Sequence, residues 1–257
     1  MNPLRHKPGY VSPDQLRGAF GVLSQIKLRT YQLMGIRPGH KVLDAGCGIG
    51  GDLLPLFRLV GEDGEVHGVD HDPEMFLIAD KNPSFVYNQI HIRQADVMAL
   101  PYPDGYFDSV RCDRVLQHVE DPSIALREFH RVLKKGGRLV ISDTDWSSIS
   151  VDCPERHLER AMRDFLAWEG VASGWFAKAA PRASYEAGFR GIDTEIVALH
   201  SRGHNPEPNS TMWEIEERAV RQGAVTREQM DRWRNYYSAG LSSTNIIITS
   251  AKKSAFV

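Results

Sequence analysis

The sequence predicts an α/β fold, in which buried strands alternate with amphipathic helices around an open, mostly parallel sheet. The strongest observation is the segment KVLDAGCGIGGD at 41–52, where an apolar strand runs into a glycine-rich turn. A helical pattern of apolar residues follows directly, from Leu53 to Val60. The second observation is that strand and helix patterns keep alternating to about residue 150. The third is a late pair of strand patterns, at 192–200 and 245–250.

An N-terminal helix precedes the first strand. Ser12 followed by Pro13 fits an N-cap with proline at the first helical position. The spacing of apolar residues predicts one helix from Pro13 to about Met34, which Gly35 and the Pro38-Gly39 pair end.

Strands and helices then follow one another as this fold class requires. The further strands are expected at 65–69, 89–94, 106–112 and 139–141. Pro83 ends the helix after the second strand, and Pro122 begins a helix that Gly136-Gly137 stops. Because parallel strands end at one edge of a sheet, residues that follow them should line a common crevice.

The alternation lapses between 150 and 188. Two helical patterns, at about 154–168 and 172–187, carry several aromatic residues there. We expect an insertion that caps the substrate, although the same aromatic residues would equally serve to pack it onto the sheet. Helices are expected again at 211–222 and 226–238, before the final strand.

The glycine turn predicts a ligand that approaches backbone amides at a helix N-terminus. Gly46, Gly48 and Gly51 also fit G-x-G-x-x-G, a pattern shared with dinucleotide-binding proteins. Asp44 separates the two interpretations, because a carboxylate repels a pyrophosphate but attracts a cation. S-adenosylmethionine (SAM) carries an ammonium and a sulfonium and no phosphate. The segment therefore favours SAM over NAD.

Four segments in order resemble those of a class I SAM-dependent methyltransferase: VLDAGCGIGGD, VHGVDHD at 66–72, QADVMALPYPDGYFDSV at 94–110 and RVLKKGGRLVISD at 131–143. The group that the chain resembles most contains the ubiquinone and menaquinone C-methyltransferases. The resemblance implies a Rossmann-like sheet of seven strands in the order 3-2-1-4-5-7-6, with the last strand antiparallel. It also implies one methyltransferase domain over 1–257, with a lid helix (1–38), a SAM-binding core (39–149), a helical cap insertion (150–188) and C-terminal strands and helices (189–257).

Cofactor-binding residues can be assigned from this pattern. Asp70 follows Gly51 by 19 positions, close to the spacing of a carboxylate that accepts bonds from ribose hydroxyls. The resemblance implies that Asp96 accepts from the adenine amino group, while the alternative is an Asx-turn cap. Met75 would pack on the adenine or, equally, within a helix core. The full expected set is Asp44, Gly46, Gly48, Asp70, His71, Met75, Asp96, Val97 and Asp113.

No motif identifies a catalytic base. Methyl transfer needs one only if the acceptor atom carries a proton. The candidates by location are His118, Asp145, His200, His204 and Tyr10. For His118, a structural role in the loop before the next helix is the alternative. His200 and His204 lack a third ligand, and Cys47, Cys112 and Cys153 lack metal-binding spacing, so we predict no metal.

Composition narrows the function further. Hydrophobic residues make up 42% and charged residues 25% of 257 residues, which is ordinary for a globular enzyme. The net charge of -2 argues against a nucleic-acid binder, and no apolar run suits a membrane span or a signal peptide. We expect a cytoplasmic enzyme with a small-molecule methyl acceptor, and the sequence does not indicate its oligomeric state. The alternatives are an NAD- or FAD-linked oxidoreductase and a non-catalytic SAM-binding protein.

Overall fold

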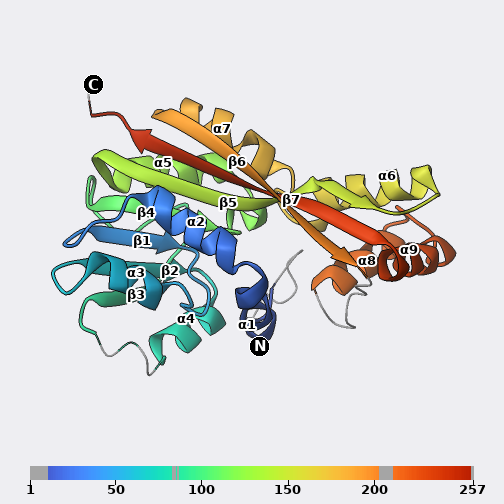
Figure 1. Ribbon diagram of the computed structural model, residues 1–257, viewed down its shortest axis with the longest axis horizontal. Helices are drawn as coiled ribbons and strands as arrows, with labels where there is room; N and C mark the ends of the chain where they lie inside the picture. The colour runs from blue at the N-terminus through green and yellow to red at the C-terminus, as the bar shows by residue number, and fades with distance from the viewer. Residues whose placement is uncertain (1–10, 83–84, 86, 203–210, 256–257) are drawn as a thin grey trace.

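The computed structural model describes residues 11–82, 85, 87–202 and 211–255, and it contains one seven-stranded sheet (Figure 1). The strands are β1 (Lys41–Ala45), β2 (Glu65–Asp70), β3 (Ile90–Gln94), β4 (Phe107–Asp113), β5 (Leu133–Val151), β6 (Phe189–Arg202) and β7 (Leu241–Lys253). Their order is β3-β2-β1-β4-β5-β7-β6, and β7 runs antiparallel to both of its neighbours. The predicted strand order and the antiparallel last strand are confirmed.

Helices cover both faces of the sheet, and others form a separate lobe. The α-helices of the described chain are α1 (Pro13–Val22), α2 (Ser24–Met34), α3 (Leu53–Val60), α4 (Pro73–Asp80), α5 (Pro122–Val132), α6 (Arg156–Phe165), α7 (Phe176–Glu186), α8 (Thr211–Arg221) and α9 (Arg227–Ala239). Successive residues of a strand point to opposite faces. Val42 of β1 accordingly packs in a core with α2 and α3, whereas Leu43 packs in a core with α5 and α7.

The N-terminal helix is not continuous, which corrects the prediction of one helix from Pro13 to Met34. It breaks at Leu23 into α1 and α2. The break lets α2 bury Ile26, Tyr31 and Met34 against the sheet, while α1 turns away toward the glycine turn. There, Leu16 of α1 lies so close to Gly48 that a Cβ on this glycine would stand 2.9 Å from the Leu16 Cδ1 atom.

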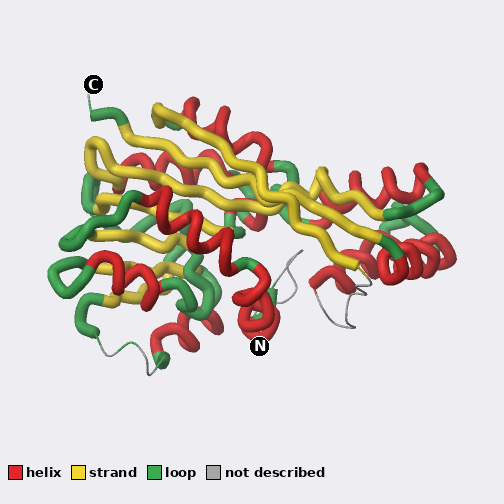
Figure 2. The backbone as a smooth tube through the Cα atoms, viewed as in Figure 1, coloured by secondary structure: helices red, strands yellow, loops and turns green. Residues whose placement is uncertain are grey.

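A helical lobe extends from the carboxyl end of β5, and its make-up corrects the predicted cap (Figures 1 and 2). The expected insertion at 150–188 divides. Its second helix, α7, packs on the sheet through Phe176 and Ala180. Its first helix, α6, joins α8 and α9 around a separate core that contains Leu158, Met162 and Trp233. Strands β5 and β7 run past the main sheet to support this lobe.

Candidate functional site

The glycine turn after β1 is folded tightly against its neighbours. Gly46 and Gly48 both have positive φ, 80° and 55°. The amides of Gly46 and Cys47 donate to the Val69 carbonyl at 2.8 and 2.9 Å, which ties the turn to β2. A Cβ at Gly46 would stand 2.2 Å from the Val115 Cγ2 atom, so only glycine fits both the backbone angle and the space.

Asp70 lies at the end of β2 and holds the same turn. Its Oδ2 accepts from the Gly48 amide at 2.8 Å, and its Oδ1 accepts from the Asp72 amide at 2.9 Å. Each carboxylate oxygen has a second lone pair, so Asp70 can still accept from a ligand hydroxyl. His71 beside it is exposed, and Met75 is buried on α4. The structure thus brings Asp70 to the glycine turn.

Asp96 follows β3, the next strand outward. Its side chain is exposed, and its Oδ1 accepts from the Met98 amide at 2.8 Å, which is the Asx turn considered as the alternative. Val97 beside it is buried. Because β3, β2 and β1 are neighbours and run parallel, the residues that follow them lie along one edge of the sheet.

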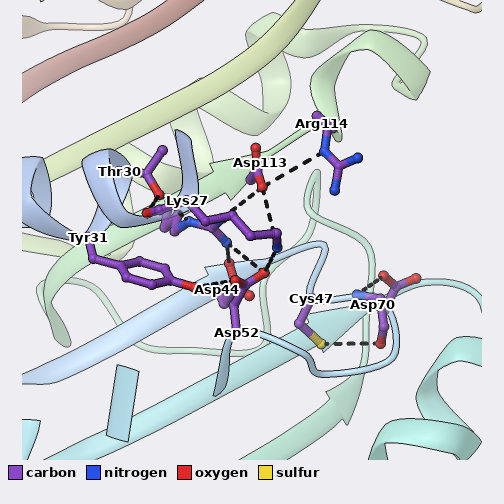
Figure 3. A network of polar contacts seen from close by, with 11 residues as sticks. Lys27, Thr30, Tyr31, Asp44, Cys47, Asp52, Asp70, Asp113 and Arg114 are labelled. Atoms are coloured by element: carbon purple, nitrogen blue, oxygen red, sulfur yellow. Dashed lines mark hydrogen bonds and ion pairs between the residues drawn. The ribbon is translucent and has the colours of Figure 1, made fainter. Parts of the chain in front are cut away.

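A network of buried charges lies on the other side of the glycine turn (Figure 3). Asp44 lies one residue before the end of β1 and is 1% exposed; its Oδ1 accepts from Arg111 Nη1 at 2.8 Å. Arg111 comes from β4, and its Nη2 donates to Asp113 Oδ2 at 2.7 Å. Asp113 therefore contacts Arg111 directly. The other oxygen of Asp44 has no hydrogen-bond donor among the described residues.

Helix α2 contributes three polar side chains to this network. Lys27 forms an ion pair with Asp52, the residue just before α3, and the Tyr31 hydroxyl donates to the same carboxylate. Thr30 accepts from Arg111 Nε at 2.8 Å. The N-terminal segment is thereby joined to the glycine turn through buried charges (Figure 3).

Two carboxylates of the network, Asp44 and Asp52, titrate differently. Burial raises the pKa of Asp44 to about 6, because the attraction of Arg111 only partly offsets the loss of solvent. Burial acts in the same sense on Asp52, but there Arg111 and Lys27 together prevail and hold its pKa at about 2. Asp44 is therefore the carboxylate that gains most from an additional cation.

A second polar group forms where β4 ends and its pairing with β5 stops, at Asp113 and Ser142. Trp146 Nε1 donates to Gln117 Oε1 at 3.0 Å, and Gln117 Nε2 lies 2.9 Å from His118 Nε2. The Gln117 carbonyl accepts from the Ser173 amide at 2.8 Å, so the segment before α7 folds over this group. Burial raises the pKa of Asp143, at the same edge, well above its usual range.

The candidate bases do not converge on one point. Burial lowers the pKa of His118 to about 4. Asp145 is buried, accepts from the Ser147 amide and hydroxyl at 3.1 and 2.6 Å, and lies 3.6 Å from Lys178 Nζ. His200 is exposed on β6, two strands away from β5, so it lies away from the glycine turn. Tyr10 and His204 lie outside the described residues.

Sequence reasoning missed Lys27, Asp52, Arg111 and Asp143. A charged side chain in the middle of an apolar strand, as in Arg111, is the one signal that could have found the network, because such a charge must be paired. Lys27 gives no such signal on an amphipathic helix.

Comparison with known proteins adds three findings. A family model described as a methyltransferase domain matches residues 36–183. An uncharacterised 37.1 kDa protein of a Streptomyces fradiae transposon is 35% identical over 207 residues, which cover 79% of this chain and 59% of that protein. The demethylmenaquinone methyltransferase of Lysinibacillus sphaericus is 36% identical over 138 residues, which are 53% of this chain and 58% of the relative. The chain thus spans less than two thirds of these relatives.

Solved structures share the fold at low identity. Phosphoethanolamine N-methyltransferase 2 of Haemonchus contortus, in complex with SAM, has a TM-score of 0.59 and 18% identity, with 90% of this chain and 52% of that chain covered. Geranyl diphosphate C-methyltransferase of Streptomyces coelicolor has a TM-score of 0.56 and 18% identity, with 90% and 77% covered. At this identity the likeness is evidence for the fold alone.

Proposed function

The chain belongs to the SAM-dependent methyltransferases, and from that premise we propose that it transfers the methyl group of SAM to a small apolar or aromatic molecule. The assignment of SAM as cofactor rests on the environment of Asp44. A buried carboxylate beside a glycine turn, with one oxygen unpaired among the described residues, suits a cationic and phosphate-free nucleoside. The oxidoreductase alternative has no support from the relatives named above.

In the proposed cofactor site, each strand end contributes one recognition element. Asp44 faces the cationic part of SAM, and the amides of the turn at Gly46 and Gly48 lie against its backbone atoms. Asp70 accepts from the ribose hydroxyls, with His71 and Met75 beside the adenosine. Asp96 and the Val97 amide read the adenine. Asp113 acts through Arg111, which it contacts in the structure.

The acceptor is proposed to lie where the pairing of β4 with β5 stops, against the group formed by Gln117, His118 and Trp146. An indole beside an amide suits a flat, apolar molecule with one polar edge. The demethylmenaquinone methyltransferases that match this chain are named for an acceptor of this kind. Whether an O, C or N atom receives the methyl group is the part of the proposal that experiment must resolve.

Alignment supplies most of the proposed catalysis. The reaction is an in-line displacement that leaves a neutral thioether, so the acceptor atom must lie about 3 Å behind the methyl carbon in a dry site. With a pKa of about 4, His118 is neutral at pH 7 and a weak base. We propose that it orients Gln117, with which it is in contact.

The helical lobe is proposed to close the acceptor site from the carboxyl end of β5. This keeps the chain one methyltransferase domain, with the cap built from α6, α8 and α9 in place of 150–188. The lobe is attached to β5, the strand that contains Trp146, and α8 contacts α1 through the Thr211 hydroxyl and Gln15 Oε1, 3.0 Å apart. The described chain has no helix long and apolar enough for a membrane span. A cytoplasmic location and a non-nucleic-acid acceptor belong to the proposal.

Calorimetry and turnover test this proposal in two stages. SAM should bind and NAD should not; binding of NAD alone would overturn the cofactor assignment. Release of the demethylated cofactor is then measured with a prenylated hydroquinone, a simple phenol and a phosphorylated amine. Turnover confined to the phosphorylated amine would contradict the apolar acceptor. Binding of SAM without turnover on any metabolite pool would favour the non-catalytic alternative.

A further inference from the structure

We propose that Glu65, His67 and His91 form a binding site for a divalent transition-metal ion such as Zn²⁺, on the face of β2 and β3. One ligand atom from each residue lies within 4.8 Å of the other two. We predicted no metal from the sequence, in which no spacing indicates this site, since the two histidines meet only through the pairing of separate strands. The inference is independent of the methyltransferase assignment.

The backbone fixes the arrangement of the three ligands. Parallel strands β2 and β3 pair His67 directly with His91, so both imidazoles leave the same face of the sheet, with ring centroids 4.7 Å apart. Glu65 precedes His67 by two residues and therefore shares that face. Ligands that come from strands are held more precisely than ligands that come from loops.

The separation of two ligand atoms already suits a shared ion. Glu65 Oε2 lies 3.1 Å from His67 Nε2. Two ligands that each lie about 2.1 Å from one ion are separated by roughly 3.0 to 3.4 Å in octahedral or tetrahedral geometry. The third ligand, His91, is half-exposed on the edge strand, so a small rotation of its ring can complete the set.

Neighbouring side chains hold the ligands in place. Two neighbours hold the Glu65 carboxylate. Lys41 Nζ lies 2.7 Å from Oε1, and the Tyr106 hydroxyl donates to Oε2 at 3.0 Å. The His67 ring packs edge-on against Phe107, at 5.2 Å between centroids. Carboxylates that bind metals are commonly oriented by such outer hydrogen bonds.

The His67 ring is buried, and its Nδ1 atom has no hydrogen-bond partner among the described residues.

Two imidazoles and one carboxylate are a ligand set for Zn²⁺, Co²⁺, Ni²⁺ or Fe²⁺ rather than for Mg²⁺ or Ca²⁺. The side chain of Glu65 is 29% exposed, so water can occupy the remaining coordination positions. Lys41 and Arg93 are the cations nearest to the ligands, and they weaken the site. We therefore expect micromolar affinity rather than the tighter binding of closed structural zinc sites.

The ion would fasten the edge of the sheet and would not take part in methyl transfer. His67 lies three residues before Asp70 along β2, which is about 10 Å at the rise of an extended strand. Strand β3 has one neighbour in the sheet, β2, and the ion would join the two through side chains. Binding should therefore appear as stability rather than as activity.

The experiment uses the full chain, stripped of metal by a chelator and titrated with Co²⁺ and Zn²⁺. We expect the visible absorption bands of coordinated Co²⁺, and a rise in Tm of about 5 °C at Zn²⁺ concentrations near 100 times the Kd. His91→Gln and Glu65→Gln should each weaken Co²⁺ binding at least tenfold. Both residues are partly exposed, so these variants avoid the aromatic core around His67.

His157→Gln is the matched control, because His157 also lies beside a glutamate, 3.7 Å from Glu155, but on the exposed surface of α6. It should bind Co²⁺ as the wild type does. Absence of Co²⁺ bands at about 100 μM free metal would overturn the proposal, as would unchanged binding by His91→Gln. SAM binding by the stripped protein, measured in parallel, should be unaltered, which separates this result from the test of the methyltransferase function.

Discussion

Asp44 combines two properties that rarely coexist in one side chain. It is buried against Arg111, which stabilises its charge, yet its second oxygen has no hydrogen-bond donor among the described residues. A buried carboxylate in that situation is costly until a donor or cation approaches it. The groups that face it come from three sides: Arg111 on β4, Asp52 before α3, and Lys27 on α2.

Cofactor affinity should therefore depend on pH through Asp44. The ionised carboxylate attracts the cation, and its pKa is about 6, so lowering the pH through this value protonates it. We expect SAM to bind about tenfold more weakly at pH 5 than at pH 7. Asp44→Asn should bind weakly at both values. A flat wild-type profile in calorimetry between pH 5 and 7 would contradict the role of Asp44.

The second prediction at this scale concerns Asp70. Replacing it by alanine removes the proposed acceptor for the ribose and frees the Gly48 amide that it now holds. Two hydrogen bonds to a charged group correspond to a rise of at least about 100-fold in the Kd for SAM. Asp63→Ala, in the exposed turn before β2, is the control and should leave the Kd unchanged. Equal affinities for the two variants would remove Asp70 from the site.

The positions of Asp44 and Asp70 beside the glycine turn could be predicted from the sequence, because both follow from distance along the chain to that turn. The partners of Asp44 could not. Arg111 Nε donates to Thr30 and its Nη1 donates to Asp44, so one guanidinium joins an N-terminal helix, β1 and β4. These segments come together only when the sheet is assembled, so no local sequence pattern predicts that they are in contact.

Helix α2 is an element whose two faces offer a direct comparison. Lys27 points inward to Asp52, with about a tenth or less of either side chain exposed. Arg29 points outward and binds Glu195 on β6 through two nitrogen atoms, with distances from 2.5 to 3.0 Å. The same helix thus carries one buried and one exposed ion pair.

Lys27→Met should lower the free energy of unfolding by about 3–5 kcal/mol, because it leaves the Asp52 charge buried with fewer partners. Arg29→Met, the matched change on the exposed face, should have a far smaller effect because water screens that pair. Urea unfolding measures both. Adding Asp52→Asn to Lys27→Met should restore part of the loss, and equal losses for the two single variants would be incompatible with this explanation.

Element boundaries show where periodicity stops being informative. The apolar spacing from Pro13 to Met34 is unbroken, so it could not reveal the turn at Leu23 that redirects α1. The helix at 176–186 and the helix at 156–165 both carry an aromatic residue, Phe176 and Phe165, yet they pack in different cores. What separates them is the length of β5, and strand ends depend on pairing with β7 rather than on local composition.

At the scale of the whole molecule, the helical lobe and the edge of the sheet that carries the glycine turn (the cofactor edge) are held by different cores. Trp233 is 1% exposed in the lobe core, which contains residues of α6, α8 and α9 and of the far end of β5. The glycine turn instead rests on the cores that flank β1 and β4. A substitution that destabilises the lobe should therefore leave cofactor binding at the glycine turn largely unchanged.

Trp233→Ala should destabilise the lobe by about 3–5 kcal/mol, the usual cost of removing a large core side chain. Hydrogen exchange should quicken in α6, α8 and α9, while the Kd for SAM changes less than twofold and turnover falls. Trp168→Ala, at the 62% exposed indole of the same lobe, is the control for exchange. A loss of SAM affinity above tenfold in the core variant would show that lobe and cofactor edge form one cooperative unit.

The sequence predicted the order of all seven strands because four ordered motifs define the family, and the family defines the topology. It could not predict the lobe, whose helices come from both sides of β6 and whose core forms only when they meet. The last two strands were predicted from the strand patterns at 192–200 and 245–250. The strands themselves span 189–202 and 241–253, so they are longer than the segments from which they were predicted.

The position of β7 has a consequence for how the protein is made. This strand lies between β5 and β6, so that Leu139 pairs with Ala251 and Thr194 pairs with Thr249. Before residues 241–253 have been synthesised, the edges of β5 and β6 that pair with β7 have no hydrogen-bond partners. Nascent chains should therefore depend on a chaperone until that segment leaves the exit tunnel, and translation pauses within it should favour aggregation.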